Sequence, residues 1–416
     1  MMACGGVTGQ AHGRNIKPKV DEGRMKMAYE RLFSGGEIGG LTLKNRVFMT
    51  AAGCALCEEG GVVTEGLLAY YEARARGGVG AIVTEVVRVN EETGVMNAHQ
   101  LCATGDRHIG EIRKLADRLR PYGCRLFLQL HHPGNVTHPG LLGGRRPVSA
   151  SGLPSLMSDQ AVDTLDTGQI RSIVNDFGDA ARRVQEAGAD GVEIHGAHFY
   201  LLHQFLTPLF NKRTDEYGGG HGNRMRFLKE VVADVQAKCG RDFPLLVRIS
   251  VEDYMGERGY HLDEGVKICQ DLEAMGVHAI DVTCAGAGCP GRQSLEPASF
   301  PQGWRKHLGA AVKELVGIPV VSVAPVRDPA FAEELLAQGQ LDFVGSARCH
   351  IADPEWAAKA RDGRDSEIRR CISCLKCIRG IQNGLPISSA VNHVCGREGE
   401  AGRRWGISDK QEAQEE

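Results

Sequence analysis

The chain has 416 residues, of which 42% are apolar and 24% are charged. This size and composition allow a sizeable core in one large domain or two ordinary ones, so disorder is not expected. Lysine and arginine number 49 against 52 aspartate and glutamate residues, and the net charge of −3 excludes a basic field for nucleic acid or anionic lipid. The sequence contains no apolar run of about 18 residues, so no membrane span is predicted. Its first residues lack the apolar core of a secretory signal peptide. We therefore expect a cytoplasmic protein.

Four parts of the chain differ in composition. Residues 1–27 are polar and rich in glycine, which predicts a flexible extension. Residues 28–362 alternate short apolar runs with amphipathic segments, as a single folded domain would. Residues 363–399 form a cysteine-rich segment, and residues 400–416 form a charged tail that we expect to be solvated.

Short runs rich in β-branched residues recur along residues 28–362 and predict buried parallel strands. They are Arg46–Ala52, Gly80–Val86, Arg125–Leu130, Gly191–His195, Leu245–Ser250, Ala279–Thr283, Pro319–Val323 and Phe343–Ala347. Amphipathic helical patterns lie between these runs. Examples are Glu65–Arg76, Gly110–Arg120, Ile170–Ala187, Asn223–Ala237, Glu264–Ala274 and Pro329–Ala337.

Eight strand–helix units in one chain predict an α/β fold of the (β/α)8 TIM-barrel type, followed by the cysteine-rich segment. An open, doubly wound sheet is the alternative. We favour the barrel because candidate site residues follow most of the predicted strands, whereas an open sheet gathers its site at one switch point.

Two histidines and a tyrosine lie at the carboxyl end of the fourth predicted strand, which ends at His195, and barrel enzymes carry their chemistry at this end. His195 and His198 can both donate hydrogen bonds to one substrate oxygen, and Tyr200 can deliver a proton nearby. A zinc site that adds His132 is one alternative. A purely structural pair of hydrogen-bonded histidines is another.

Small residues follow the seventh and eighth predicted strands, where barrels often bind phosphate on backbone N–H groups. They are Ala324 and Ala347, and Arg348 would add a bidentate clamp. Pro325 removes one of the N–H donors from this site. Ordinary tight loops with a surface arginine explain the same pattern equally well.

Three cysteines are spaced by two residues in Cys371-x2-Cys374-x2-Cys377. This spacing suits an iron–sulfur cluster held by thiolates. Zinc is the competing metal, and three reduced structural cysteines are the remaining alternative.

The sequence resembles the old yellow enzyme family of FMN-dependent oxidoreductases. Within that family it is most similar to the iron–sulfur branch of 2,4-dienoyl-CoA reductase and the barrel of trimethylamine dehydrogenase. The likeness extends from about Leu32 to Glu398. It rests on the motifs LKNRVFMTAA, YYEARARGGVGAIVTE, FLQLHHPG, DGVEIHGAHFYLLHQFLTPLFNKRTDEYGG, VRIS, ARCHIADPEWAAKARDGR and CISCLKC.

This resemblance implies roles for the residues at the predicted strand ends. Ala51 and Ala52 would lie against the flavin ring, and Gln129 would hydrogen-bond its pyrimidine edge. Arg248 would stand near the N1/C2 carbonyl, where a fixed cation stabilises a reduced flavin. Ala324, Ala347 and Arg348 would bind the FMN phosphate.

The resemblance also implies catalytic roles. His195 and His198 would hold the carbonyl oxygen of an activated alkene, and Tyr200 would protonate its α-carbon. We therefore expect an FMN-dependent ene-reductase that acts on a small α,β-unsaturated carbonyl compound. NAD(P)H or a reduced carrier would supply the electrons.

A 4Fe-4S cluster on Cys371, Cys374 and Cys377 is the further implication. The family's fourth ligand falls near Ser389, which is not a cysteine, so Cys395 is the predicted substitute. A cluster implies an electron-donor protein, either a ferredoxin or an FAD/NAD(P)H flavoprotein subunit. The sequence leaves open whether the chain forms a homo-oligomer.

Three rival functions remain, one of which is a non-catalytic electron-transfer subunit in which Tyr200 would have no role. An amine dehydrogenase or demethylase of the trimethylamine dehydrogenase type would use the same cofactors oxidatively, and it would call for an aromatic cage. A zinc-dependent barrel hydrolase would use His132, His195 and His198.

Overall fold

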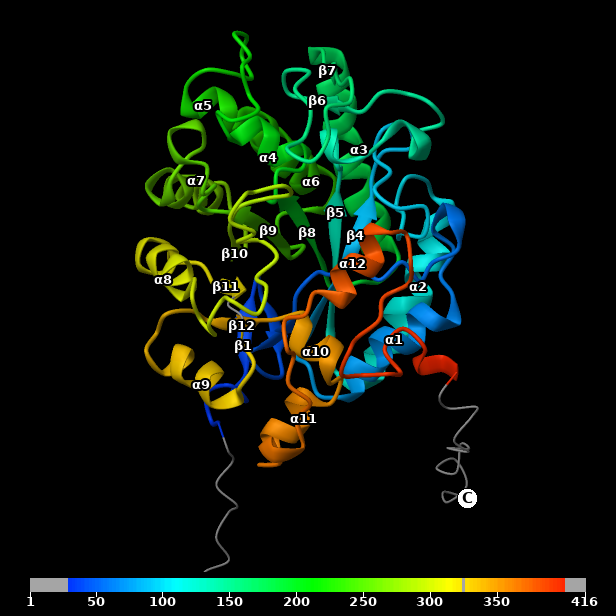
Figure 1. Ribbon diagram of the computed structural model, residues 1–416, viewed down its shortest axis with the longest axis vertical. Coiled ribbons are helices and arrows are strands. Elements are labelled where there is room, and N and C mark those ends of the chain that lie inside the picture. Colours follow the sequence, from blue (N-terminus) through cyan, green and yellow to red (C-terminus); the bar gives the residue numbers. More distant parts are fainter. Residues whose placement is uncertain (1–28, 324–325, 401–416) are drawn as a thin grey trace, which may run out of the picture.

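A computed structural model describes residues 29–323 and 326–400 of the protein. Eight parallel strands form a closed barrel in it (Figure 1). In chain order they are β3 (Val47–Met49), β4 (Ala81–Arg88), β5 (Arg125–His131), β8 (Gly191–Gly196), β9 (Leu245–Ser250), β10 (Ala279–Thr283), β11 (Val320–Val323) and β12 (Phe343–Gly345). Parallel pairing of β12 with β3 closes the ring. The predicted TIM barrel is confirmed, and the open sheet is wrong.

The barrel strands are buried except for a few half-buried residues in β4, β5 and β11, as nearly continuous apolar runs predict. Both β9 and β10 have the predicted bounds, and every residue in them is buried. By contrast, β3 and β12 are shorter than predicted. The chain leaves the sheet after Met49 and after Gly345, and the small residues that follow form loops instead of strand.

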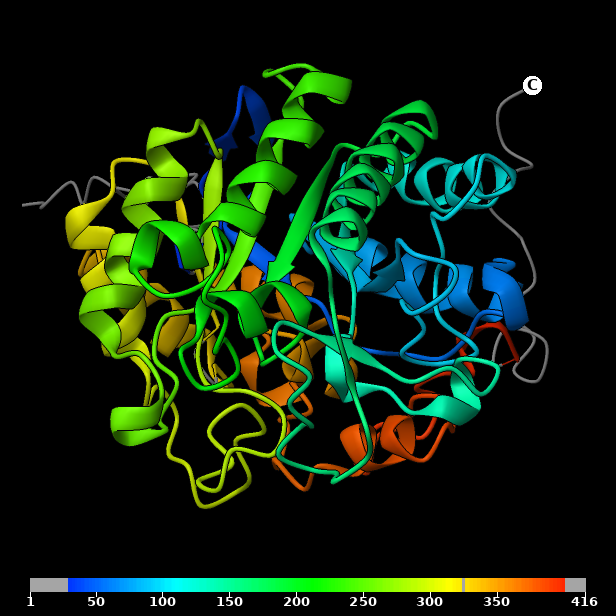
Figure 2. The same ribbon diagram turned by 90° about the horizontal axis from the view of Figure 1, so that it is seen from above.

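The described residues contain twelve α-helices, most of which surround the barrel on its outside (Figure 2). They are α1 (Glu65–Arg76), α2 (Arg107–Leu119), α3 (Thr167–Glu186), α4 (Leu201–Leu206), α5 (His221–Arg224), α6 (Arg226–Cys239), α7 (Leu262–Ala274), α8 (Lys306–Leu315), α9 (Pro329–Ala337), α10 (Arg348–Ala352), α11 (Trp356–Arg361) and α12 (Lys376–Gln382). A capping box starts α3, because Asp166 accepts from the Gln169 amide at 2.8 Å while Gln169 accepts from the Asp166 amide at 2.9 Å.

A small hairpin closes the amino-terminal end of the barrel. It consists of β1 (Gly36–Ile38) and β2 (Leu41–Leu43), which pair antiparallel. Ile38 and Leu43 are fully buried against aromatic and aliphatic side chains inside the barrel. Only the opposite end, where the strands have their carboxyl termini, is therefore left open for a site. A second small sheet, β6 (Val148–Ser149) with β7 (Asp163–Thr164), belongs to the long β5–α3 connection.

The cysteine-rich segment folds over the open end of the barrel. Its helix α12 lies in front of β4 in Figure 1, and Figure 2 shows the orange-to-red segment at one end of the barrel. Ile387 donates to the Cys54 carbonyl at 2.9 Å and so joins the segment to the loop after β3. On α1, the fully buried Arg74 pairs with Glu398 at 2.7 Å and holds the end of the segment.

No helix in residues 29–323 and 326–400 is long and apolar enough to cross a membrane. The predicted extension 1–27, the tail beyond Glu400, and the predicted phosphate residue Ala324 lie outside the described residues.

Candidate active site

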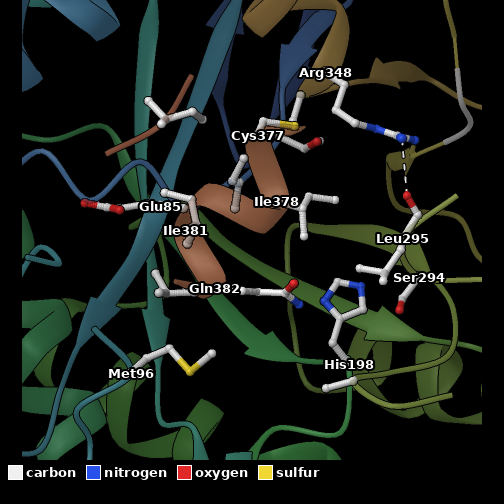
Figure 3. Close-up of a pocket in the computed structure, with 18 of the residues that line it drawn as sticks. Glu85, Met96, His198, Ser294, Leu295, Arg348, Cys377, Ile378, Ile381 and Gln382 are labelled. Atoms are coloured by element: carbon white, nitrogen blue, oxygen red, sulfur yellow. Dashed lines mark hydrogen bonds between the residues drawn. The ribbon is translucent and has the colours of Figure 1, made fainter. Parts of the chain in front are cut away.

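A cavity of about 1280 Å³ opens at the carboxyl ends of the strands. Its wall includes nine of the predicted site residues: Ala51, Ala52, His198, Tyr200, Arg248, Ala347, Arg348, Cys371 and Cys377. Helix α12 forms another part of the wall, and Figure 3 shows Ile378, Ile381 and Gln382 facing His198 across the space. Gln129 and His195 do not line the cavity, because both are buried in the strands beneath it.

Four aromatic side chains form a cluster at one side of this cavity. The ring of His195 lies 5.1 Å from that of His198 and 5.0 Å from that of Tyr200. His131, at the end of β5, lies 4.4 Å from Tyr200 and 5.2 Å from His195, measured between ring centroids. The structure therefore brings the three predicted catalytic residues together and adds His131.

A tight turn after β8 creates this arrangement. His198 and Phe199 have φ values of 61° and 62°, a left-handed conformation that costs energy outside glycine. Neighbouring strands hold the turn. The Ser250 hydroxyl accepts from the His198 amide at 3.1 Å, and Thr283 Oγ1 lies 3.0 Å from His198 Nε2. Gly286 allows the loop after β10 to pack on the turn, because a Cβ there would lie 2.3 Å from the Phe199 ring.

Burial sets the protonation states in the cluster. Desolvation lowers the pKa of His131, His195 and His198 well below the usual value, so these imidazoles are neutral at neutral pH. Burial also raises the pKa of Tyr200 to about 12, although the charge of Arg248 opposes the shift. The site thus offers neutral N–H donors and a protonated phenol.

Four polar side chains lie on neighbouring strands below the cavity. Gln129 Nε2 donates to Glu193 Oε1 at 2.7 Å, and Arg248 Nε lies 3.4 Å from Asp281 Oδ2. Glu193 and Asp281 are fully buried, and only Arg248 reaches the cavity wall. Burial is the largest cause that raises the pKa of both carboxyl groups.

Arg348 meets a carboxylate at the other side of the cavity. Its guanidinium donates to Glu296 Oε2 at 2.6 Å and to the Leu295 carbonyl at 3.2 Å, the contact drawn in Figure 3. Glu296 also accepts from Trp304 Nε1 at 2.9 Å and pairs with Arg305 at 2.9 Å. The predicted phosphate clamp is therefore already paired with a buried acid.

The three spaced cysteines line one small hollow beside the cavity. Cys371, Cys374 and Cys377 share this hollow with Ser389, and Cys371 and Cys377 also reach the large cavity. Cys395 does not line the hollow. Its Sγ lies 4.0 Å from Arg74 Nη2 instead. Across residues 29–323 and 326–400, no group of three or more His, Cys, Asp or Glu side chains is close enough to enclose an ion.

The zinc trio of the hydrolase alternative does not form. Both ring nitrogens of His132 have other partners, with Nε2 lying 3.0 Å from Thr93 Oγ1 and Nδ1 accepting from the Gly134 amide at 3.1 Å. His132 therefore has no free nitrogen to share a metal with His195 and His198.

His131 was placed at a strand end by the sequence reasoning but was given no role, and Glu296 was missed. His131 follows Gln129 by two residues on one strand, so the period of two could have placed both on the inner face. Glu296 carries no comparable signal. Glu296 contacts Arg348, which lies 52 residues later in the sequence. Glu296 itself lies in a loop, where its φ is 50°.

Comparison with known proteins identifies the family. Residues 31–367 match the model of the NADH:flavin oxidoreductase / NADH oxidase family. The chain therefore belongs to this family, the old yellow enzyme family that its motifs resemble. Membership implies a flavin and a nicotinamide nucleotide as cofactors and makes the protein an oxidoreductase.

Individual relatives are similar over most of this chain. It is 42% identical over 373 residues to an NADH oxidase of Thermoanaerobacter brockii, covering 89% of this chain and 57% of that protein. It is 32% identical over 380 residues to an N,N-dimethylglycine/sarcosine dehydrogenase of Chromohalobacter salexigens, with 89% and 54% covered. A structure of 2-naphthoyl-CoA reductase superposes with a TM-score of 0.84 at 26% identity, with 89% and 58% covered. The chain thus spans about half the length of these relatives.

The neutral histidines predict how stability depends on pH. An unfolded chain binds protons at its histidines below about pH 6.5, whereas the folded chain keeps His131, His195 and His198 neutral. We expect the free energy of unfolding to fall between about pH 7 and about pH 5, by up to about 1.4 kcal/mol per pH unit for each such histidine. Urea unfolding at several pH values measures this slope.

The matched variants are His131→Gln at the buried position and His393→Gln at an exposed one. The first should reduce the slope by up to one histidine's share, and the second controls for replacing an imidazole by an amide. An unchanged slope in His131→Gln would show that His131 is protonated in the folded chain.

Proposed function

We propose that this protein is an FMN-dependent ene-reductase that reduces a C=C bond conjugated with a carbonyl group. Electrons from NAD(P)H or a reduced carrier would reach the flavin through a 4Fe-4S cluster. The observation that carries this proposal is the cluster of His195, His198 and Tyr200, neutral and desolvated, beside a large cavity with Arg248 in its wall.

The cavity suits FMN on several counts. Ala51 and Ala52 give a small-residue surface on which a flat ring can stack, and Arg248 offers a positive charge at one edge. Gln129, whose side chain donates to Glu193 beneath the cavity, would hydrogen-bond the pyrimidine edge of the flavin. Arg348 and the small Ala347 stand where a phosphate would be held. The bound flavin would supply the hydride chemistry.

The chain's own residues would hold and protonate the substrate. Thr283 engages Nε2 of His198 and orients the ring, which leaves the other nitrogen for a carbonyl oxygen. His195 adds a second imidazole 5.1 Å away, and two donors on one oxygen stabilise negative charge that develops there. Tyr200 keeps its proton at neutral pH and can give it up only to a strong base, such as the α-carbon of an enolate.

Amine oxidation is the second candidate, because one relative is a dimethylglycine/sarcosine dehydrogenase. A site for a methylated ammonium group would be favoured by aromatic faces around it. Among the described residues that line the cavity, Tyr200 is the only Phe, Tyr or Trp. Conjugated carbonyl compounds, represented among the relatives by 2-naphthoyl-CoA, match the imidazole donors better.

Substitution of Tyr200 tests the proton-delivery step. Tyr200→Phe removes the acid but keeps the ring, so enone turnover should fall by about 10²- to 10⁴-fold. Reduction of the flavin by its donor should stay at the wild-type rate, and stopped-flow absorbance resolves the two half-reactions. Tyr122→Phe is the control, because Tyr122 bonds Glu72 away from the cavity. Equal enone turnover in Tyr200→Phe and wild type would assign the proton to another donor.

The identity of the flavin is tested at Arg348. Arg348→Ala should weaken FMN binding by about 1.5–3 kcal/mol, because a charged hydrogen-bond donor to the phosphate is lost. Binding of riboflavin, which has no phosphate, should be unchanged. Arg292→Ala alters an exposed arginine of the same cavity and should affect neither ligand. Fluorescence titration gives both affinities, and parallel losses for the two flavins would contradict a phosphate role.

An iron–sulfur cluster on Cys371, Cys374 and Cys377 is supported by donor chemistry and by charge. The three thiols line one hollow, and thiolates are the ligands such clusters prefer. Residues 368–397 carry five arginine and lysine side chains and no acidic residue, which suits an anionic group. Because Cys371 and Cys377 also border the large cavity, the cluster would lie next to the flavin. A ferredoxin or an FAD/NAD(P)H flavoprotein subunit would be its electron donor.

The fourth ligand is the open point of this cluster. Cysteine chemistry favours Cys395, whereas position in the fold favours Ser389, because only Ser389 lines the hollow with the other three. We expect Cys395→Ala to keep the full iron content after anaerobic reconstitution, and Cys377→Ala to lose most of it. Iron and sulfide analysis measures both. If Cys395→Ala loses as much iron as Cys377→Ala, Cys395 is a ligand.

A further inference from the structure

Four buried side chains connect the floor of the cavity to the interior of the barrel. Gln129 and Glu193 are directly paired in the register of β5 with β8, and Arg248 and Asp281 are paired in that of β9 with β10. Their exposed fractions are 1%, 0%, 5% and 0%, in that order. Arg248 also lines the cavity, so the net charge of these four side chains changes the electrostatic potential in the cavity. Little water is present to screen that charge.

The group contains more acid than its cation can balance. Arg248 offsets one of the two carboxylates, and the other nearby cation, Arg305, is already paired with Glu296 at 2.9 Å. Glu193 Oε2 and both carboxylate oxygens of Asp281 are buried without a hydrogen-bond partner, and burial followed by the charge of Asp281 raises the pKa of Glu193. Two buried carboxyl groups that share one cation favour keeping a proton over a second negative charge. At least one proton is therefore held between them.

Other titratable groups around the carboxyl pair do not supply the missing charge. His195 on β8, His131 on β5 and His198 after β8 are neutral because they are desolvated. Tyr200 is protonated and equally neutral. The balance of charge beneath the cavity is thus decided by the two carboxyl groups and Arg248.

We propose that Glu193 and Asp281 form a proton reservoir that adjusts the charge which Arg248 presents to the cavity. With one proton on the pair, the charges of Glu193, Asp281 and Arg248 sum to zero. With two protons on the pair, these charges sum to +1, and an anion beside Arg248 is stabilised. Binding of negative charge in the cavity and proton uptake by the pair are therefore linked, each favouring the other.

This inference rests on the proposed flavin, and it gives the reduction a complete balance. NAD(P)H or a reduced carrier would supply two electrons and one proton to a bound flavin. Arg248 would stabilise the negative charge left in the cavity, and the carboxyl pair would take up a second proton from water. Glu193 and Asp281 touch no reacting atom, so they are positioning residues.

The test is the midpoint potential of the bound flavin as a function of pH. Each proton taken up with two electrons changes the potential by about 30 mV per pH unit. Burial raises the pKa of Glu193 to about 8, so the pair keeps one proton below that pH and can accept a second. Between about pH 6 and about pH 8 we expect about 59 mV per pH unit in the wild type.

Two isosteric variants and one control make this result specific. Glu193→Gln and Asp281→Asn each remove one carboxyl group while keeping its size, so the slope should fall to about 30 mV per pH unit. Asp342→Asn alters a carboxylate at the amino end of β12, paired with Lys313 at 2.9 Å, and should keep the wild-type slope. Equal slopes in the wild type and both core variants would overturn the reservoir.

A second measurement separates this inference from the proposed function. Infrared spectra of the flavin-free protein are recorded for the wild type, Glu193→Gln and Asp281→Asn, and each variant's spectrum is subtracted from that of the wild type. The differences should contain the carbonyl band of a protonated carboxyl group. If the protein binds no flavin but the band is present, the proposed function fails and the shared proton stands. If flavin binds and the band is absent from both differences, the reservoir is wrong.

Discussion

Burial of ionisable side chains at the open end of a closed barrel is the constraint on which the chemistry of this protein depends. The β1–β2 hairpin fills the other end, so the strands can present polar groups at one end only. Taking charge out of water there costs free energy, and each group avoids that cost by staying neutral or by pairing. His195 stays neutral, Tyr200 keeps its proton, and Glu193 shares one with Asp281.

The same constraint explains how the cavity and the cysteine-rich segment belong together. Helix α12, Cys371 and Cys377 form part of the cavity wall, so the segment shields the site as well as offering thiolates. Arg74 and Glu398 hold the far end of that segment against α1 as a buried ion pair. Because a buried charge without its partner is strongly destabilising, this pair fixes where the segment can lie.

Much of the fold could be predicted because its signals are local. Continuous apolar runs identified the strands, and β9 and β10 have the predicted bounds. His195, His198 and Tyr200 were found because they follow a strand on the side where barrels carry their sites. The family expected from the motifs is confirmed.

What sequence could not supply was contact between distant segments. The pairing of Glu296 with Arg348 depends on how a long loop closes over the cavity, and no periodicity encodes that. Nor could spacing reveal that Ser389, not Cys395, lines the hollow of the three cysteines. No role was predicted for the two buried acids on β8 and β10, and only the strand pairing in the barrel shows that Asp281 lies beside Arg248.

Anaerobic reoxidation of the reduced protein tests the central claim most directly. Protein loaded with FMN and reduced under argon would be mixed with an α,β-unsaturated ketone, and flavin absorbance would be followed without oxygen. The site described above predicts rapid return of the oxidised spectrum, with one saturated ketone formed per flavin. A flavin that stays reduced with conjugated carbonyl compounds of every size, yet accepts electrons from methylated amines when oxidised, would contradict it.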